Sequence, residues 1–330
     1  MDSLEQKNKN TPPVGGVVAA TVTPCTEDGV PSEADMEQLV GHLAENGSDG
    51  VFIVGSTGEQ PLLDDHERRR LTEAARRGLK EHCLLYVGVS GAGPRQTLRY
   101  ARSAAADGAD IVVVMAPSTF SFSQEELYAY VATLADASAV PVAIYHHLRM
   151  RTAFGFEITT RLMEHPNIVA MKDTSTDMVR FGRLMPIAVE TNTALMQGSE
   201  RLLLESFRKG AAGCVTALAG LAPRWHANLF RACRRGDDEA AEMEQRRIER
   251  LWEIFQFDEM KTSFSYFARS LKLGLVAQGW IRGAASTMPG FVPVPGFDQK
   301  VRRHLVEVGL LRSGVPAPHS RYEAEVEKVD

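Results

Sequence analysis

Residues 167–174 read Asn-Ile-Val-Ala-Met-Lys-Asp-Thr, and this stretch decides how the chain is interpreted. Its apolar run, bounded by His-Pro-Asn and Thr-Ser-Thr, has the length and composition of a strand that is buried on both faces. A lysine at the end of such a strand must extend to the surface, pair with an acid, or lie in a dry pocket as a nucleophile. Lys172 alone leaves all three open, with Asp173 and Glu59 as candidate acidic partners.

Composition and charge exclude several classes of protein. The chain has 330 residues, 44% of them hydrophobic, so it can bury one barrel-sized core or two smaller ones. Its net charge of −5 provides no basic surface for nucleic acid. No apolar run approaches the ~20 residues that span a bilayer, and the first residues lack the apolar segment of a signal peptide. Because the cysteines are far apart and form no CxxC pair, we expect reduced thiols in a cytoplasmic protein.

Buried-strand patterns alternate with helical patterns along the chain. The predicted strands recur at intervals of about 28 residues, the size of a βα unit, and cover residues 14–22, 50–54, 84–89, 111–115, 140–145, 168–173, 194–198 and 213–216. Helical patterns cover residues 32–46, 64–80, 94–106, 124–137, 157–164, 178–189, 200–209 and 222–235. At two helix starts, Ser32 with Asp35 and Asp64 with Glu67 have the spacing of capping boxes.

Eight consecutive βα units predict a (β/α)8 barrel rather than an open doubly wound sheet. The open sheet also lacks its best marker, since no GxGxxG follows the first strand. Further helical patterns over residues 239–255, 261–275 and 298–308 predict a C-terminal helical appendage. We therefore divide the chain into a disordered tail (1–13), the barrel (14–235), C-terminal helices (236–312) and a loosely ordered tail (313–330).

The barrel topology selects the residues that meet at the catalytic end. In such barrels, chemistry is done at the C-terminal ends of the strands and in the loops that follow them. Lys172 ends the sixth predicted strand and Tyr145 the fifth, so we expect both side chains over the same opening. A desolvated lysine amine can attack a carbonyl to form a Schiff base, and a phenol and a hydroxyl can relay the protons that this reaction moves. Tyr145 and Ser56 have suitable side chains for the relay.

The loop after the second strand, Gly55-Ser56-Thr57-Gly58-Glu59, completes this set. Its glycines permit tight turns that leave main-chain N–H groups free to hold a carboxylate. Taken alone, the loop could be an ordinary turn, and Tyr145 could be a core residue with a satisfied hydroxyl. Taken together, three unusual strand ends on one face favour a Schiff-base site at Lys172.

At these residues the chain resembles the dihydrodipicolinate synthase / N-acetylneuraminate lyase family, class I aldolase-type barrels that act on pyruvate and other 2-oxo acids. Residues 55–59 are similar to the family's GxTGE signature. Tyr145 and Lys172, 27 residues apart, are similar to its catalytic tyrosine and its Schiff-base lysine. The order and separation of the motifs match as well, over roughly residues 14–311.

This resemblance implies a role for each site residue. Lys172 would form the imine, Tyr145 would be the acid and base, and Ser56 the relay. The substrate would be held by Thr57, with Gly55 beside it, and by the backbone carbonyl of Val215 near the amine. The resemblance also implies a homotetramer built as a dimer of dimers, and no metal or organic cofactor.

The loop after the fifth strand departs from the family pattern. The family often has Tyr-Asn-x-Pro followed by an arginine, whereas residues 145–152 here read Tyr-His-His-Leu-Arg-Met-Arg-Thr. Arg149 and Arg151 are therefore both candidates to bind a substrate carboxylate. His146 and His147 are either acid–base or hydrogen-bonding groups for another substrate, or solvated loop residues.

The main hypothesis is a Schiff-base lyase, of the aldolase or hydratase type, that acts on pyruvate or another 2-oxo acid and takes an aldehyde as a candidate second substrate. Dihydrodipicolinate synthase proper is an alternative. Against it, Thr119 stands near where a tyrosine from the neighbouring subunit completes the synthase's proton relay. The residues also leave open a metal-dependent barrel lyase that uses His146, His147 and Asp173, and a non-catalytic descendant that binds a small acid.

Overall fold

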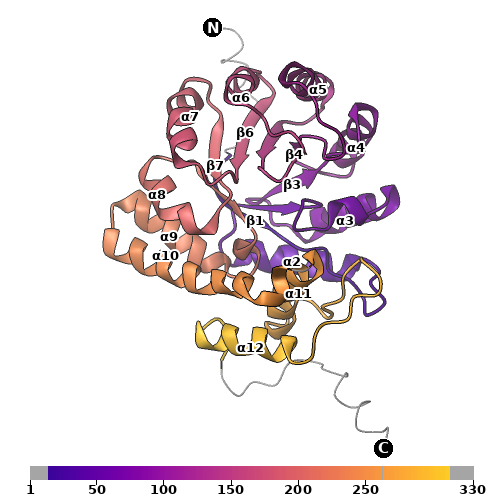
Figure 1. Ribbon diagram of the computed structural model, residues 1–330, viewed down its shortest axis with the longest axis vertical. Coiled ribbons are helices and arrows are strands. Elements are labelled where there is room, and N and C mark those ends of the chain that lie inside the picture. Colours follow the sequence, from indigo (N-terminus) through magenta and orange to yellow (C-terminus); the bar gives the residue numbers. More distant parts are fainter. Residues whose placement is uncertain (1–13, 262, 313–330) are drawn as a thin grey trace, which may run out of the picture.

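The structure is a computed structural model that describes residues 14–261 and 263–312. Its centre is a closed barrel of eight parallel strands in sequence order, with the first strand paired to the last (Figure 1). The strands are β1 (Gly16–Ala20), β2 (Gly50–Ile53), β3 (Leu84–Gly88), β4 (Ile111–Met115), β5 (Val142–His146), β6 (Ile168–Asp173), β7 (Ala194–Gln197) and β8 (Gly213–Thr216). The predicted (β/α)8 barrel is confirmed.

A helix follows each strand and packs on the outside of the barrel (Figure 1). These helices are α2 (Glu33–Glu45), α3 (Asp65–Gly78), α4 (Pro94–Ala106), α5 (Gln124–Ala137), α6 (Phe156–Met163), α7 (Met178–Glu190), α8 (Leu203–Arg208) and α9 (Pro223–Arg235). The helix predicted over residues 200–209 begins as a 3₁₀ turn, η2 (Glu200–Leu202), before α8.

The two predicted capping boxes differ in outcome. In α3 the box is complete, because the Glu67 N–H donates to Asp64 Oδ1 (2.7 Å) and the Asp64 N–H donates to Glu67 Oε2 (2.9 Å). In α2 the prediction was wrong. Ser32 accepts a hydrogen bond from the Asp35 N–H, but the Asp35 carboxylate instead accepts from Arg282 Nε (2.7 Å). A long-range ion pair to the C-terminal segment thus replaces the local contact.

Three C-terminal helices follow the barrel: α10 (Asp238–Trp252), α11 (Phe264–Ala277) and α12 (Phe297–Glu307). In Figure 1, α10 lies along α9, and α11 and α12 lie together on the same side of the barrel. The predicted helix over residues 261–275 begins later, at Phe264, because Ser263 caps it by accepting from the Ser265 N–H (3.0 Å). The predicted tails, residues 1–13 and 313–330, lie outside the described residues, so the proposed division of the chain stays a prediction.

The barrel interior is filled by side chains from alternate strand positions, except where a register shift between β5 and β6 places both Val169 and Ala170 inside. They form a separate apolar cluster of Val18, Ala20, Phe52, Tyr86, Ile111, Val113, Ala143, Tyr145, Val169, Ala170, Met196 and Val215. The larger cluster lies between the strands and the helices. Because successive strand residues face opposite sides, this alternation decides which strand-end residues reach the catalytic mouth. None of the helices in the described part of the chain is long and apolar enough to cross a bilayer.

The buried histidine of α9 should make the free energy of unfolding depend on pH. His226 is fully buried, and burial lowers its pKa from 6.5 to about 4, partly offset by its hydrogen bond to the Ala222 carbonyl (2.9 Å). Between these two values the unfolded chain binds a proton that the folded chain does not, so acid favours unfolding.

We expect the free energy of unfolding to fall between pH 7 and pH 4.5 by about 2 kcal/mol more in the wild type than in His226→Gln. Urea unfolding of both proteins at the two pH values measures this difference. Equal losses in the two proteins would contradict it.

Candidate active site

Lys172 and Tyr145 face each other at the mouth of the barrel. They are paired in register across β6 and β5, and both side chains are buried, with exposures of 6% and 3%. Lys172 Nζ lies 4.0 Å from the centroid of the Tyr145 ring and 5.6 Å from that of Phe52. Among the residues that the structure describes, none makes a hydrogen bond or an ion pair with this amine. The lysine therefore sits on aromatic faces with its nitrogen unblocked.

The two acids considered as partners of Lys172 are engaged elsewhere, so that interpretation was wrong. Asp173 points to the opposite face of the strand, where its Oδ2 lies 3.6 Å from Arg180 Nε and its Oδ1 accepts from the Ser175 N–H. Glu59 forms a fully buried ion pair with Lys272 of α11 at 3.2 Å. Asp173 points away from Lys172 because successive strand residues face opposite sides. Glu59 is neutralised by Lys272, a residue far along the chain.

The loop after β2 brings Ser56 and Thr57 to the same mouth. Ser56 Oγ lies 3.5 Å from Tyr145 Oη, and Thr57 is buried against the site. The loop is entered through Val54 at φ 51°, a conformation that a β-branched residue adopts only under strain. It fits because Gly88 at the end of β3 has no Cβ, which would collide with the Val54 carbonyl oxygen. The strained entry turns the Ser56 hydroxyl toward the phenol.

The far end of this loop is held by the C-terminal segment. Besides its ion pair with Lys272, the Glu59 carboxylate accepts hydrogen bonds from Ser286 Oγ (2.7 Å) and Thr287 Oγ1 (3.1 Å). Lys272 Nζ also donates to the Ala285 carbonyl (2.6 Å). Glu59 itself has a positive φ of 58°, so the turn depends on these contacts.

A cavity of about 740 Å³ opens above Lys172. Six of the predicted site residues line it: Ser56, Thr57, Tyr145, His147, Arg149 and Lys172. Val215 lies just below and lines a small void inside the barrel together with Lys172 and Phe52. The predicted residues Gly55, His146, Arg151 and Thr119 do not line the cavity.

Arg149 and Arg151, the two candidates for binding a substrate carboxylate, lie in different places. Arg149 lines the cavity, and its backbone N–H donates to His147 Nδ1 (3.1 Å). Arg151 is exposed, and its Nε donates to Ser121 Oγ (3.2 Å), outside the cavity. Thr119 is also exposed. Arg149 is therefore the better placed of the two to meet a substrate carboxylate.

The two histidines after β5 face opposite ways. His147 lies 5.8 Å from the Tyr145 ring, and burial lowers its pKa to about 4, with further lowering by Arg149 and Lys172. It is a neutral hydrogen-bonding group at physiological pH. His146 is buried on the outer face, where burial lowers its pKa and nearby Asp173 opposes that shift. Since His146 and Asp173 point away from His147, the three cannot bind one metal ion, and no other cluster of three such side chains exists in residues 14–261 and 263–312.

Sequence reasoning missed Glu200, which lies close to the amine. Glu200 lines the cavity, and its Oε1 accepts from the Ala217 and Leu218 N–H groups at 3.1 and 3.2 Å. Burial raises its pKa; hydrogen bonds from backbone N–H groups, that of Leu218 among them, oppose this shift, and nearby Lys172 opposes it to a smaller extent. Gly198, at the end of the strand predicted over residues 194–198, lines the cavity as well. The place of Glu200 in the loop after β7, two residues after this strand end, was the only available signal.

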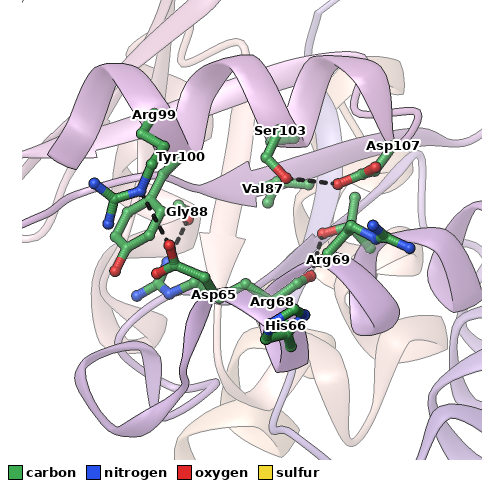
Figure 2. A pocket seen from close by; sticks show the side chains of 12 residues that line it. Asp65, His66, Arg68, Arg69, Val87, Gly88, Arg99, Tyr100, Ser103 and Asp107 are labelled. Atoms are coloured by element: carbon green, nitrogen blue, oxygen red, sulfur yellow. Dashed lines mark hydrogen bonds and ion pairs between the residues drawn. The ribbon is translucent and has the colours of Figure 1, made fainter. Parts of the chain in front are cut away.

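A second cavity, of about 200 Å³, lies between α3 and α4, away from the barrel mouth (Figure 2). Two of its acids are engaged: Asp65 accepts from Arg99 Nε at 3.0 Å, and Asp107 accepts from Ser103 Oγ at 2.8 Å. Arg68 stacks on Tyr100 at 4.1 Å and donates to the carbonyls of Gln60 and Gly88, which border the β2 loop and end β3. Arg68 therefore supports the loop from this side of the barrel.

Comparison with known proteins agrees with this geometry. Residues 13–294 match the family model described as the dihydrodipicolinate synthetase family. The chain belongs to this family. It is 33% identical to 4-hydroxy-tetrahydrodipicolinate synthase 1 of Streptomyces coelicolor over 71% of this chain and 76% of that protein. It is 30% identical to the 4-hydroxy-tetrahydrodipicolinate synthase of Acidiphilium cryptum over 78% of this chain and 87% of that protein.

Solved structures of the family share the fold. Dihydrodipicolinate synthase from Bacteroides thetaiotaomicron superposes with a TM-score of 0.82 at 24% identity, over 89% of this chain and 99% of that one. The chloride-inhibited synthase from Acinetobacter baumannii, complexed with pyruvate, superposes with a TM-score of 0.81 at 23% identity, over 90% of this chain and all of that one. Members of the dihydrodipicolinate synthetase family are class I aldolase-type lyases, and this protein is an enzyme of that class.

The absence of a side chain at Gly198 leaves space for the Lys172 side chain. A Cβ at Gly198 would collide with Thr174 Oγ1 and lie 3.0 Å from Lys172 Cε. We expect Gly198→Ala to displace the amine and to lower the rate of imine formation about a hundredfold. The measurement is the rate of borohydride-dependent labelling by pyruvate. Gly182→Ala is the matched control, because nothing lies within 4 Å of that Cβ in helix α7, and a Gly198→Ala rate equal to the control would contradict the prediction.

Loss of the buried Lys272–Glu59 ion pair should destabilise the protein strongly. Lys272→Met leaves the Glu59 carboxylate buried without its cation, which should lower the free energy of unfolding by about 3–5 kcal/mol. Urea unfolding measures the loss. The double variant Lys272→Met/Glu59→Gln should recover part of it, because the neutral amide can still accept from Ser286 and Thr287. An unchanged unfolding midpoint in Lys272→Met would show that the pair contributes nothing.

Proposed function

We propose that the protein condenses Lys172 with the ketone of pyruvate or another 2-oxo acid, and then makes or breaks a carbon–carbon bond or removes water. The observation that supports this most is the buried amine that lies on the Tyr145 ring, without an ion pair to any described acid, at the floor of an open cavity. An amine locked in an ion pair could not attack a carbonyl, whereas this one has room for a ketone beside the phenol.

Each nearby group has a role in this proposal. Tyr145 moves protons to and from the carbinolamine oxygen, and Ser56, at 3.5 Å, exchanges them with the phenol. Thr57 and the main-chain N–H groups of its loop hold the 2-oxo acid carboxylate, with Gly55 shaping the turn. The backbone carbonyl of Val215 orients the amine from below. Arg149 and neutral His147 bind polar groups of the second substrate.

4-Hydroxy-tetrahydrodipicolinate synthase activity is a second candidate, supported by the names of the relatives in Streptomyces coelicolor and Acidiphilium cryptum. Thr119 argues against it, because this position offers no phenol to a neighbouring subunit. Direct assay for that product separates the two. We further propose a cytoplasmic homotetramer built as a dimer of dimers, which light scattering of the purified chain tests.

Trapping of the imine tests the proposed chemistry. Borohydride in the presence of pyruvate should leave a reduced adduct on Lys172, located by peptide mass spectrometry, and Lys172→Met should show none. Tyr145→Phe should form the adduct about 10²–10⁴-fold more slowly, because the phenol that moves the protons is lost. No adduct with any 2-oxo acid tested would reject the proposal and leave a non-catalytic acid-binding protein as the better hypothesis.

A further inference from the structure

The cavity above Lys172 is larger than a three-carbon acid requires. Its volume of about 740 Å³ falls in the range of pockets that enclose drug-sized ligands, about 300–1,000 Å³. Ser56, Thr57, Thr174 and Glu200 give it a polar floor around the amine. The space beyond that floor must accommodate the second substrate, so its lining determines which substrates fit.

The segment from the end of α10 into α11, with the 3₁₀ turns η4 (Glu253–Gln256) and η5 (Asp258–Lys261) between them, supplies an apolar side to this cavity. We call this side the aromatic wall: Trp252, Phe255, Met260, Phe264 and Phe267. The three phenylalanine rings of the wall are neighbours, whereas the centroid of the Trp252 ring lies 5.0 Å from Arg201 Cζ. Phe267 lies 4.8 Å from Phe255 and 5.4 Å from Phe264, with interplanar angles of 31° and 34°. Among the described residues of this segment that line the cavity, the others are the uncharged Gln256 and Ser263.

The aromatic wall faces solvent in part. Phe264 is 45% exposed, and it belongs to a group of neighbouring apolar side chains, which is more informative than a single exposed apolar residue. A ligand that covers these rings removes apolar surface from water, which favours binding. Flat rings that lie at small angles to one another match a planar aromatic group, which packs by offset stacking or edge contact. Polar groups that lay directly on these rings would find only Gln256 and Ser263, among the described residues of this segment, as cavity-lining partners.

Resting on the function proposed above, we infer that the second substrate is an aldehyde that carries an aromatic or bulky apolar group, and that the aromatic wall binds this group. The wall and Lys172 line one continuous cavity, which favours a substrate over a second copy of the chain as the occupant. Polar residues near the amine hold the carboxylate end, and the wall selects the other end.

The reaction balances without an oxidant or reductant. The imine of Lys172 and pyruvate loses a methyl proton to Tyr145 and becomes an enamine. Its terminal carbon then forms a bond to the aldehyde carbon, and the aldehyde oxygen takes a proton. Water adds to the imine carbon and releases the free amine with a 4-hydroxy-2-oxo acid whose aromatic group lies on the wall. The reverse sequence cleaves the same product.

The test compares aldehydes of opposite character on the full-length chain, with pyruvate consumption as the readout. We expect kcat/KM for 2-naphthaldehyde to exceed that for glyceraldehyde by at least about tenfold in the wild type. Phe264→Ala should lower kcat/KM for naphthaldehyde about ten- to a hundredfold, and Phe264→Leu less, with little change for glyceraldehyde. Met243→Ala, an exposed residue of α10 outside the cavity, is the matched control and should change neither.

The outcomes separate this inference from the function on which it rests. Pyruvate trapped on Lys172, together with equal use of both aldehydes, would overturn the aromatic wall as a substrate site and leave the Schiff-base chemistry intact. Absence of any trapped pyruvate would reject the chemistry itself. If Phe264→Ala changed the number of subunits in light scattering but not the aldehyde preference, the wall would be a contact between copies, and the inference would be wrong.

Discussion

A lysine amine that is buried on an aromatic ring and makes no ion pair with any carboxylate of the described residues is the feature on which the rest of this structure depends. Three acids lie close enough along the chain or in space to neutralise Lys172, and each is held elsewhere. Asp173 faces Arg180 across the outer side of the strand, Glu59 is paired with Lys272, and Glu200 directs one oxygen to two backbone N–H groups. The fold thus keeps the nitrogen of Lys172 available to a carbonyl.

Much of this arrangement depends on the helices that follow the barrel. Lys272 of α11 anchors the far end of the loop that carries Ser56, and Gln245 of α10 donates to the Glu200 carbonyl (3.1 Å) at the start of the loop after β7. The same helices form the aromatic side of the cavity. The barrel therefore supplies the amine and the phenol, whereas the C-terminal helices hold the surrounding loops and shape the space for the second substrate.

The barrel, and the closeness of Lys172 to Tyr145, could be predicted from the sequence. The alternation of strand and helix patterns predicts the barrel, and the C-terminal ends of its parallel strands lie at the same rim. The sequence was insufficient where the outcome depends on long-range contacts. Nothing local to Glu59 or Asp35 indicates that Lys272 and Arg282 bind them. The choice between Arg149 and Arg151 needed the path of an irregular loop. His146 could have been placed outside the mouth from strand alternation, since it follows the inward-facing Tyr145.

The most direct test is a crystal structure of the full-length protein soaked with pyruvate. Continuous electron density should run from Lys172 Nζ to the second carbon of pyruvate, with the carboxylate in the loop of Thr57 and the Tyr145 hydroxyl beside the new bond. Two results would contradict a Schiff-base site at this position: pyruvate bound elsewhere, or Lys172 Nζ in an ion pair with no continuous density joining it to pyruvate.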